Sequence, residues 1–184
     1  MTVDEAMSDW ADEALLSAFV GGDRAAIEAL AMRHEAAMVG FASGLLSGRV
    51  DLARDAVQET WVRVLRHASG FGNRSAAKTW LYRILINLCH TMRDRERSKA
   101  TPPRLAAEGT IVETPRVESL VPGLRAAVDS LPDDRRALVL LCYHAGMTHE
   151  HAAEALEIPL GTLKSRLHAT LASLRASLMQ ESSR

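Results

Sequence analysis

Apolar side chains recur at steps of three and four residues along most of the chain, the spacing that places them on one face of an α-helix. The longest stripe follows Asp23, which we expect to cap the helix, and stops near Gly48. Its members are Ile27, Leu30, His34, Met38, Phe41 and Leu45. Runs of β-branched residues are nearly absent, so the pattern predicts an all-α protein.

The first 97 residues predict four helices that can form one bundle. The first helix has Asp12 as its N-cap and ends at Gly21–Gly22, and the long stripe forms the second. The third helix runs from Asp51 to about Ala68, and the fourth runs from a Ser75 cap to about residue 97. The inner face of the fourth helix holds Ala77, Leu81, Ile84 and Leu88.

His34 interrupts the long apolar stripe. No acidic or cysteine partner stands at helical spacing on the same face. We therefore interpret it as a half-buried structural histidine and not as a ligand or a base.

Residues 98–122 differ in composition from the rest and hold four of the six prolines. We expect a flexible linker there, with Thr110–Val112 extended because a lone strand has nothing to pair with. Two small helical domains are predicted on either side of it, over residues 1–97 and 123–184.

The sequence of the second domain predicts a helix-turn-helix. A helix from about Asp133 to His144 ends at Gly146, and Thr148 caps a short helix that runs to about Leu156. Ala152–Ala153 are small enough for a close crossing of two helices. The last helix carries an apolar seam made of Leu163, Leu167, Leu171, Leu174 and Leu178.

Charge is unevenly distributed, although the 184 residues sum to a formal net charge of -1. Residues 61–104 hold ten Lys and Arg against two Asp and Glu, whereas residues 1–60 hold four against eleven and residues 105–134 hold two against six. A basic block between acidic neighbours indicates a polyanionic partner for one face.

The two cysteines, Cys89 and Cys142, lie too far apart for a CxxC motif and suggest neither a disulfide framework nor a zinc ribbon. The N-terminus is acidic, and no run approaches the roughly 18 apolar residues of a membrane span. We expect a cytoplasmic protein without direct membrane insertion.

Three motifs then stand in a recognisable order: Asp55-Ala56-Val57-Gln58-Glu59-Thr60-Trp61, Thr79-Trp80-Leu81-Tyr82-Arg83-Ile84 with Asn87, and Ile158-Pro159-Leu160-Gly161-Thr162-Leu163-Lys164-Ser165-Arg166-Leu167. With them the chain resembles an extracytoplasmic-function (ECF, group 4) sigma factor of the sigma-70 family over about residues 12–178. The resemblance implies a non-enzymatic initiation factor with no cofactor and no metal. Its implied partners are bacterial core RNA polymerase (β′ clamp and β flap), promoter DNA and an anti-sigma factor.

The resemblance also implies site residues. Asp55, Gln58 and Glu59 would bind the core polymerase, the alternative being a solvated polar face. The minus-ten promoter element would be bound by Asn73, Arg74, Lys78, Arg83 and Asn87, with Asn73 and Arg74 in a loop that captures a flipped base, or in a plain surface turn. Arg93, Arg95 and Arg97 would contact phosphates, while Trp80 and Leu81 are expected in the core.

The last helix would read the minus-thirty-five element. The residues implied are Thr162, Lys164, Ser165, Arg166 and His168. The chain departs from the family at Ala169, where relatives usually place Arg, so this recognition helix has one cation fewer.

Two alternatives remain. A stand-alone helix-turn-helix regulator would explain the second domain but not the first. A zinc site around Cys142, His144, His149 and His151 is a weaker alternative, because the HExxH spacing is absent. No nucleophile–base pair or phosphate-binding glycine loop suggests an enzyme. The acidic segments beside the basic block also predict that the two domains or an anti-sigma factor cover the DNA-binding faces at rest.

Overall fold

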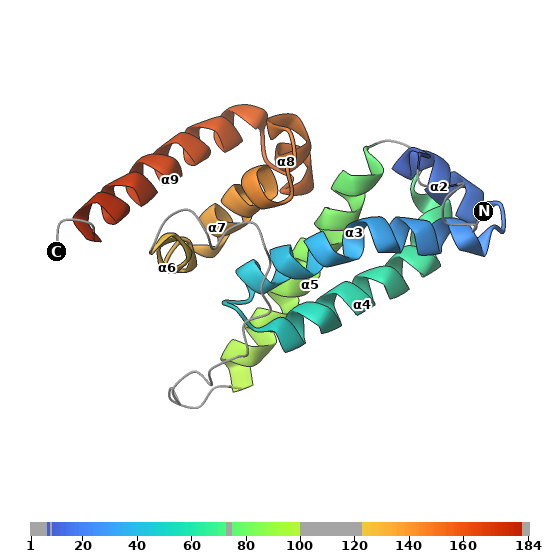
Figure 1. Ribbon diagram of the computed structural model, residues 1–184, viewed down its shortest axis with the longest axis horizontal. Helices are drawn as coiled ribbons and strands as arrows, with labels where there is room; N and C mark the ends of the chain where they lie inside the picture. The colour runs from blue at the N-terminus through green and yellow to red at the C-terminus, as the bar shows by residue number, and fades with distance from the viewer. Residues whose placement is uncertain (1–6, 8, 73–74, 100–122, 182–184) are drawn as a thin grey trace.

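The computed structural model describes residues 7, 9–72, 75–99 and 123–181, and these residues fold into two helical domains without a β-strand (Figure 1). The linker expected over 98–122, with its extended 110–112 run, lies almost entirely outside the described residues. The N-terminal domain contains α2 (Asp12–Val20), α3 (Arg24–Leu45), α4 (Val50–His67), a 3-10 turn η1 (Ala68–Gly70) and α5 (Ala77–Lys99). The C-terminal domain contains α6 (Leu124–Asp129), α7 (Asp133–Val139), a π-helical turn η2 (Leu140–His144), α8 (His149–Ala155) and α9 (Leu160–Glu181).

The long stripe of α3 is the centre of the N-terminal domain, as predicted. Asp23 accepts a hydrogen bond from Ala25 N–H at 3.0 Å and caps the helix. Phe41 is fully buried and meets Tyr82 of α5 edge to face, with ring centroids 5.0 Å apart. Burial of each large side chain contributes about 1.5–3 kcal/mol, so this stripe fixes α4 and α5 on α3. The fully buried members are Leu30, Met38, Phe41 and Leu45, whereas Ile27 is partly exposed.

Asp12 does not cap α2, and this part of the prediction is wrong. The N-cap is Ala11, and the Asp12 carboxylate instead accepts from Arg33 Nη1 at 2.6 Å and lies 2.7 Å from His34 Nε2. His34 is 7% exposed, so it is the structural histidine predicted, but its acidic partner comes from a neighbouring helix. Glu13 accepts from Ala77 N–H at 2.8 Å, which ties α2 to the start of α5.

The C-terminal domain follows the predicted helix-turn-helix with two differences. Helix α6 was not predicted from the sequence. Leu171 is 36% exposed and lies outside the seam, where Thr170 is fully buried and donates to Arg166 O at 2.7 Å. A stripe along a straight helix steps by three and by four, so the buried sequence after Leu167 continues through position 170 to Leu174. Thr148 caps α8 by accepting from His151 N–H at 3.2 Å, as predicted.

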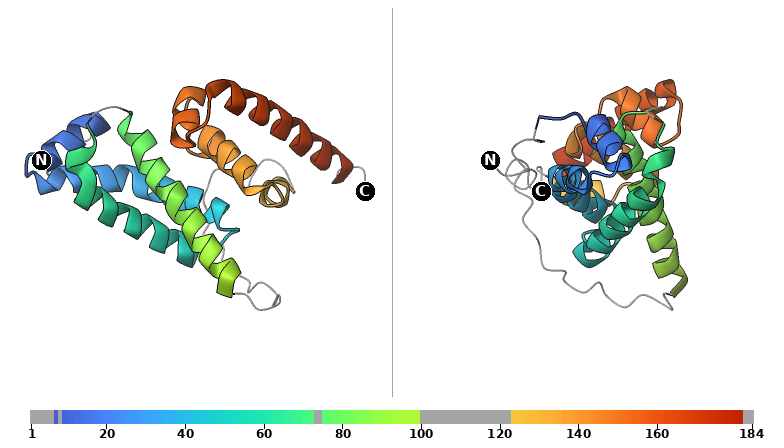
Figure 2. Two further views of the ribbon diagram at one scale, coloured as in Figure 1. Left: turned by 180° about the vertical axis from the view of Figure 1, so that it is seen from behind. Right: turned by 90° about the vertical axis from the view of Figure 1, so that its right-hand side faces the viewer.

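The two domains pack against each other along one side of the bundle (Figures 1 and 2). Helices α7 and α8 and the turn η2 lie against α3 and α5, while α9 packs on α6, α7 and α8. A Cβ atom added at Gly44 of α3 would lie 2.8 Å from Leu140 Cδ1, so glycine is what lets η2 approach α3 this closely. His144 Nε2 lies 3.2 Å from the Ala37 carbonyl oxygen across the same interface.

Candidate nucleic-acid and protein interfaces

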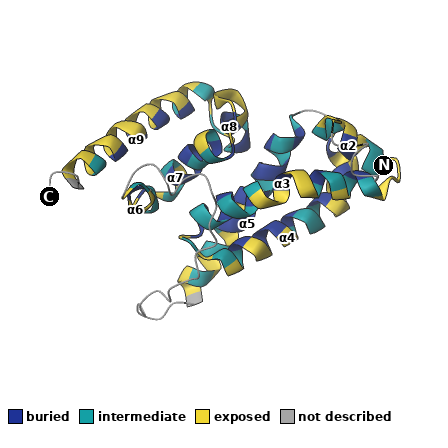
Figure 3. Ribbon diagram, viewed as in Figure 1, coloured by how far each residue is buried: buried dark blue, intermediate teal, exposed yellow. Residues whose placement is uncertain are grey.

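The acidic face of α4 is open to solvent. Asp55 and Gln58 are exposed and Glu59 is partly exposed, with Glu59 accepting from Arg63 Nε at 3.1 Å one turn further on. The opposite side of the helix is buried at Ala53, Ala56, Val57, Thr60 and Val64, and Figure 3 shows this alternation along α4. Amphipathic periodicity therefore holds the three predicted side chains on one outward face.

The first turn of α5 places the Lys78 side chain against the C-terminal domain. Lys78 Nζ donates to the Ala145 carbonyl oxygen at 2.5 Å. Burial lowers the pKa of Lys78, and the negative charge of Asp12 acts in the opposite direction. The rings of Phe71 and Trp80 contact each other with centroids 5.2 Å apart and planes tilted by 47°, which holds this end of the helix. Trp80 lies partly in the core, and Leu81 is fully buried as predicted. Asn73 and Arg74 lie outside the described residues.

Further along α5, Arg83 also points to the C-terminal domain. Its Nη2 donates to the Glu154 carbonyl oxygen at 2.6 Å, and its guanidinium lies 3.9 Å from the Glu154 carboxylate and 3.6 Å from that of Glu157. Asn87, about one turn on, is exposed. The structure describes three of the predicted minus-ten residues: Lys78 and Arg83 contact α8 or the turn before it, and Asn87 faces solvent.

The end of α5 holds a second contact between the domains. Arg93 Nη2 and Arg97 Nη2 lie 2.6 Å and 3.2 Å from the same carboxylate oxygen of Asp133, the first residue of α7. Arg93 also donates to the Leu45 carbonyl oxygen at 3.0 Å and is mostly buried. This pairing was not predicted residue by residue, although the basic block and the acidic segment that includes Asp133 were its signal.

The first turns of α9 carry all the predicted minus-thirty-five residues. Lys164, Ser165, Arg166 and His168 are exposed, and Thr162 is partly exposed. Arg166 lies 3.5 Å from the Asp134 carboxylate of α7, a surface pair that is worth little and leaves the side chain accessible. The turn before α9 holds Glu157 at φ +55°, a left-handed conformation that is unusual for a residue with a side chain.

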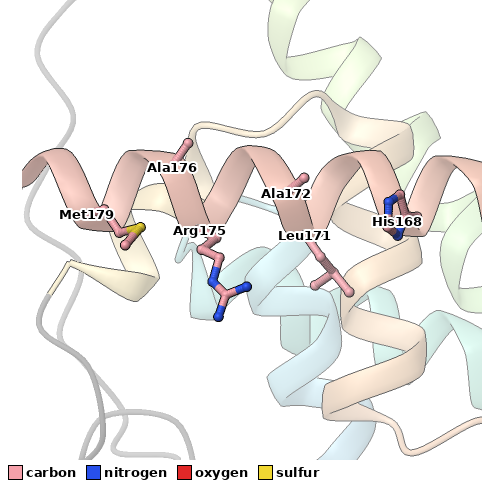
Figure 4. Close-up of a pocket in the computed structure, with 6 residues that line it drawn as sticks. All are labelled: His168, Leu171, Ala172, Arg175, Ala176 and Met179. Atoms are coloured by element: carbon pink, nitrogen blue, oxygen red, sulfur yellow. The ribbon is translucent and has the colours of Figure 1, made fainter.

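A shallow apolar groove runs along the exposed side of α9 (Figure 4), with a volume of about 520 Å³. Its lining is His168, Leu171, Ala172, Arg175, Ala176 and Met179. The groove starts at His168, so it continues the predicted DNA-reading surface toward the C-terminal end of the helix.

Neither a metal centre nor a membrane span is found within the described ranges. No three His, Cys, Asp or Glu side chains gather there in a way that could hold a metal ion. Burial raises the pKa of the Cys142 thiol and that of Cys89, the latter to about 12. None of the helices described is both long and apolar enough to cross a bilayer.

The fold defines a class: a two-domain helical protein with a bundle before a helix-turn-helix. Residues 30–99 match the family model of sigma-70 region 2, and residues 123–174 match that of sigma-70 region 4. The chain is 30% identical over 170 residues to the ECF RNA polymerase sigma-E factor of Haemophilus influenzae, covering 85% of this chain and 89% of that protein. It is 32% identical over 155 residues to SigM of Mycobacterium tuberculosis, an ECF RNA polymerase sigma factor, and the match covers 84% of this chain and 78% of that protein.

A third relative and two solved structures are also similar. SigE of Mycolicibacterium smegmatis, named as an ECF RNA polymerase sigma factor, is 38% identical over 145 residues, which are 75% of this chain and 56% of that protein. The sigma factor RpoE of Bartonella quintana, solved with the anti-sigma factor NepR, superposes with a TM-score of 0.65 at 25% identity, covering 84% and 96%. CnrH, solved with the cytosolic domain of CnrY, shares the fold with a TM-score of 0.69 at 20% identity, covering 92% and 97%.

The chain therefore belongs to the ECF sigma factors of the sigma-70 family, non-enzymatic proteins that direct RNA polymerase in transcription initiation.

Proposed function

We propose that this sigma factor binds core RNA polymerase through the outward face of α4 and holds a promoter through α5 and α9. The observation that carries the proposal is the presence of matches to region 2 and region 4 on one chain, in this order, with the predicted contact residues of α4 and α9 on exposed faces. A stand-alone regulator would need only the second of these domains.

Binding to polymerase rests on Asp55, Gln58 and Glu59. Two carboxylates and an amide on one exposed helical face can pair with basic and amide groups of a partner helix. The buried side of α4 packs on α3 and α5, so its exposed face, with Asp55, Gln58 and Glu59, lies on a rigid element.

Promoter binding divides between the two domains. In the N-terminal domain, Asn73, Arg74, Lys78, Arg83 and Asn87 would bind the minus-ten element and trap non-template bases as the duplex melts. Each flipped base costs a few kcal/mol of stacking and pairing, which cationic and amide contacts can offset. In the C-terminal domain, Thr162, Lys164, Ser165, Arg166 and His168 would read the minus-thirty-five element from the major groove.

The remaining features of the proposal concern partners and organisation. An anti-sigma factor is an expected partner, because RpoE of Bartonella quintana was solved with one. We place the two binding units at residues 1–97 and 123–184, with 98–122 as the linker, and expect no catalytic activity of the protein's own. Core polymerase and the chromosome would keep it in the cytoplasm.

The test is run-off transcription with bacterial core polymerase and a library of promoter fragments, with and without the protein. Specific initiation that depends on the protein is expected, and it yields both promoter elements. The triple variant Asp55→Ala, Gln58→Ala, Glu59→Ala should lose initiation while it keeps duplex binding. Folded protein that binds duplex DNA but never supports initiation would establish the stand-alone regulator instead.

A further inference from the structure

The first turn of α5 takes a hydrogen-bond acceptor from another helix. Ala76 is the N-cap of α5, because its carbonyl oxygen accepts the first helical hydrogen bond, from Trp80 N–H at 3.1 Å. Alanine has no side-chain acceptor for the free N–H groups of this turn, and Ser75, the predicted cap, lies one residue earlier. The Glu13 carboxylate of α2 supplies an acceptor, since its Oε1 lies 2.8 Å from Ala77 N.

Helix α2 holds both ends of the loop that joins η1 to α5. It packs on η1 before the loop and on α5 after it. The Phe71 ring, directly after η1, also contacts the Trp80 ring of α5. Leu15 and Leu16 of α2 are buried, so the helix that carries Glu13 is itself fixed on the bundle. The ends of the loop are therefore set before any ligand arrives, which lowers the ordering cost of binding.

The two acids in the first turn of α2 have different partners. Asp12 pairs with Arg33 and His34 of α3, whereas Glu13 accepts from the main chain of α5. A carboxylate at a helix N-terminus is stabilised by the helix dipole, and its hydrogen bond is stronger than that of a neutral acceptor. Glu13 is therefore the acid of α2 that controls the start of α5.

We propose that Glu13 is a positioning residue for minus-ten recognition, which holds the first turn of α5 and the end of the loop before it in the arrangement that receives unpaired bases. The inference rests on the proposed function, which assigns the minus-ten element to this end of α5. Glu13 itself does not touch DNA. Its loss weakens the melting of the promoter and leaves the binding of core polymerase by α4 unchanged.

Three variants separate this role from a general loosening of α2. Glu13→Ala removes the acceptor, and Glu13→Gln keeps an amide oxygen at the same distance along the side chain. Asp12→Asn weakens the attachment of α2 to α3 while the bond from Ala77 to Glu13 remains. Thermal denaturation of each variant gives the temperature range in which it is folded and can be compared with the wild type.

The experiment uses the full chain with saturating core polymerase and a promoter that the run-off library yields. This promoter is tested as a paired duplex and as a template whose minus-ten region is opened by mismatches. Glu13→Ala should lower initiation on the duplex by about threefold to tenfold, the range that the loss of a helix cap spans, and by less than about twofold on the opened template. Permanganate oxidation of unpaired thymines should show the same loss of melting.

The controls should not show this difference between templates. Glu13→Gln should initiate within about twofold of the wild type on both, because the amide oxygen still accepts the hydrogen bond. Asp12→Asn should keep the wild-type ratio of duplex to opened template. In the free chain, Glu13→Ala should speed amide exchange in the first turn of α5.

Four results would overturn the positioning role. These are an unchanged ratio of duplex to opened template in Glu13→Ala, an equal fall of that ratio in Asp12→Asn, a defect in Glu13→Gln as large as that of Glu13→Ala, and unchanged amide exchange at the start of α5. The outcome is separable from that of the proposed function. If the wild-type chain supported initiation on no promoter, both would fail, whereas an active wild type matched by Glu13→Ala would remove the positioning role alone.

Discussion

Helices α4 and α5 pack together in one bundle (Figure 1), yet one of their predicted binding faces is open to solvent and the other contacts the C-terminal domain. Asp55 and Gln58 of α4 are exposed, whereas Lys78 and Arg83 of α5 donate to carbonyl oxygens of the C-terminal domain. Both faces are polar, so hydrophobicity does not decide which of them is covered.

Charge decides it. The part of the C-terminal domain that meets the bundle brings the carboxylates of Asp133, Glu154 and Glu157. These groups attract the cations of α5 and would be repelled by the acidic face of α4.

The largest expected effect comes from reversing the charge of the open face. Asp55→Lys with Glu59→Lys should weaken binding to core polymerase by about 100-fold, because a charged contact becomes repulsive. Titration of labelled protein with core polymerase measures it. Glu35→Lys, an exposed acid of α3, serves as the control. Equal affinity of all three proteins would mean that the α4 face is only solvated.

A smaller effect, with two readouts, is expected at the covered face. Lys78→Ala with Arg83→Ala should lower promoter initiation about tenfold at saturating core polymerase, since two phosphate contacts are lost. The same variant should enlarge the free chain, because both residues also donate to carbonyl oxygens of the C-terminal domain. Run-off transcription and small-angle X-ray scattering measure the two effects. Arg24→Ala, at an exposed cation of α3, should change neither.

Local features of the fold could be predicted from the sequence. The caps at Asp23 and Thr148 and the buried stripe of α3 follow from rules that link residues a few positions apart. These rules failed where a partner came from another element. Asp12 was predicted as a cap, but Arg33 and His34 of α3 lie close enough to take its carboxylate, and no periodicity could reveal that.

The candidate sites show the same limit of local rules. Periodicity and resemblance were enough to place Asp55, Gln58 and Glu59 on one face and the α9 residues on another. They could not show that Lys78 and Arg83 meet α8, because that contact depends on how two domains pack. The unequal charge of the segments was the one long-range signal. Lys78, Arg83 and Arg93 of the basic block do contact the C-terminal domain, but the predicted DNA-binding residues of α9 are not covered.

A substitution at the start of α2, at a residue that belongs to neither proposed contact set, should affect stability most. Asp12→Asn removes the charged partner of Arg33 and His34 and should cost about 1 kcal/mol of unfolding free energy at pH 7. Chemical denaturation measures it, with the exposed Glu35→Gln as control. Polymerase affinity and oligothymidine affinity should stay at wild-type values in the fraction that remains folded.

The stability difference between the wild type and Asp12→Asn should depend on pH in a direction that follows from the pKa of Asp12. Burial raises the pKa of Asp12, but the hydrogen bonds and charges of His34 and Arg33 outweigh burial and hold it below its ordinary 3.8. A carboxyl whose pKa is depressed by folding stabilises fully above its unfolded pKa and loses that contribution as the pH falls through the folded value. The wild-type advantage over Asp12→Asn should therefore persist at pH 5, begin to decline as the pH falls below about 3.8, and disappear once the pH has passed the lower folded pKa. A difference that grew on acidification would contradict the pairing.

The smallest effect is expected from Gly44→Ala, because two effects on stability oppose each other there. Alanine favours the helical backbone of α3 by about 0.5 kcal/mol, but its Cβ atom would lie 2.8 Å from Leu140 Cδ1, so that side chain must move. Amide hydrogen exchange separates the terms, because protection should rise slightly in α3 and fall in η2. Gly161→Ala, with open space around its Cβ, should raise protection in α9 without a loss elsewhere. If protection rose in α3 and η2 together, Leu140 would have adapted to the new methyl group, and the close approach at Gly44 would not be what holds the two domains together.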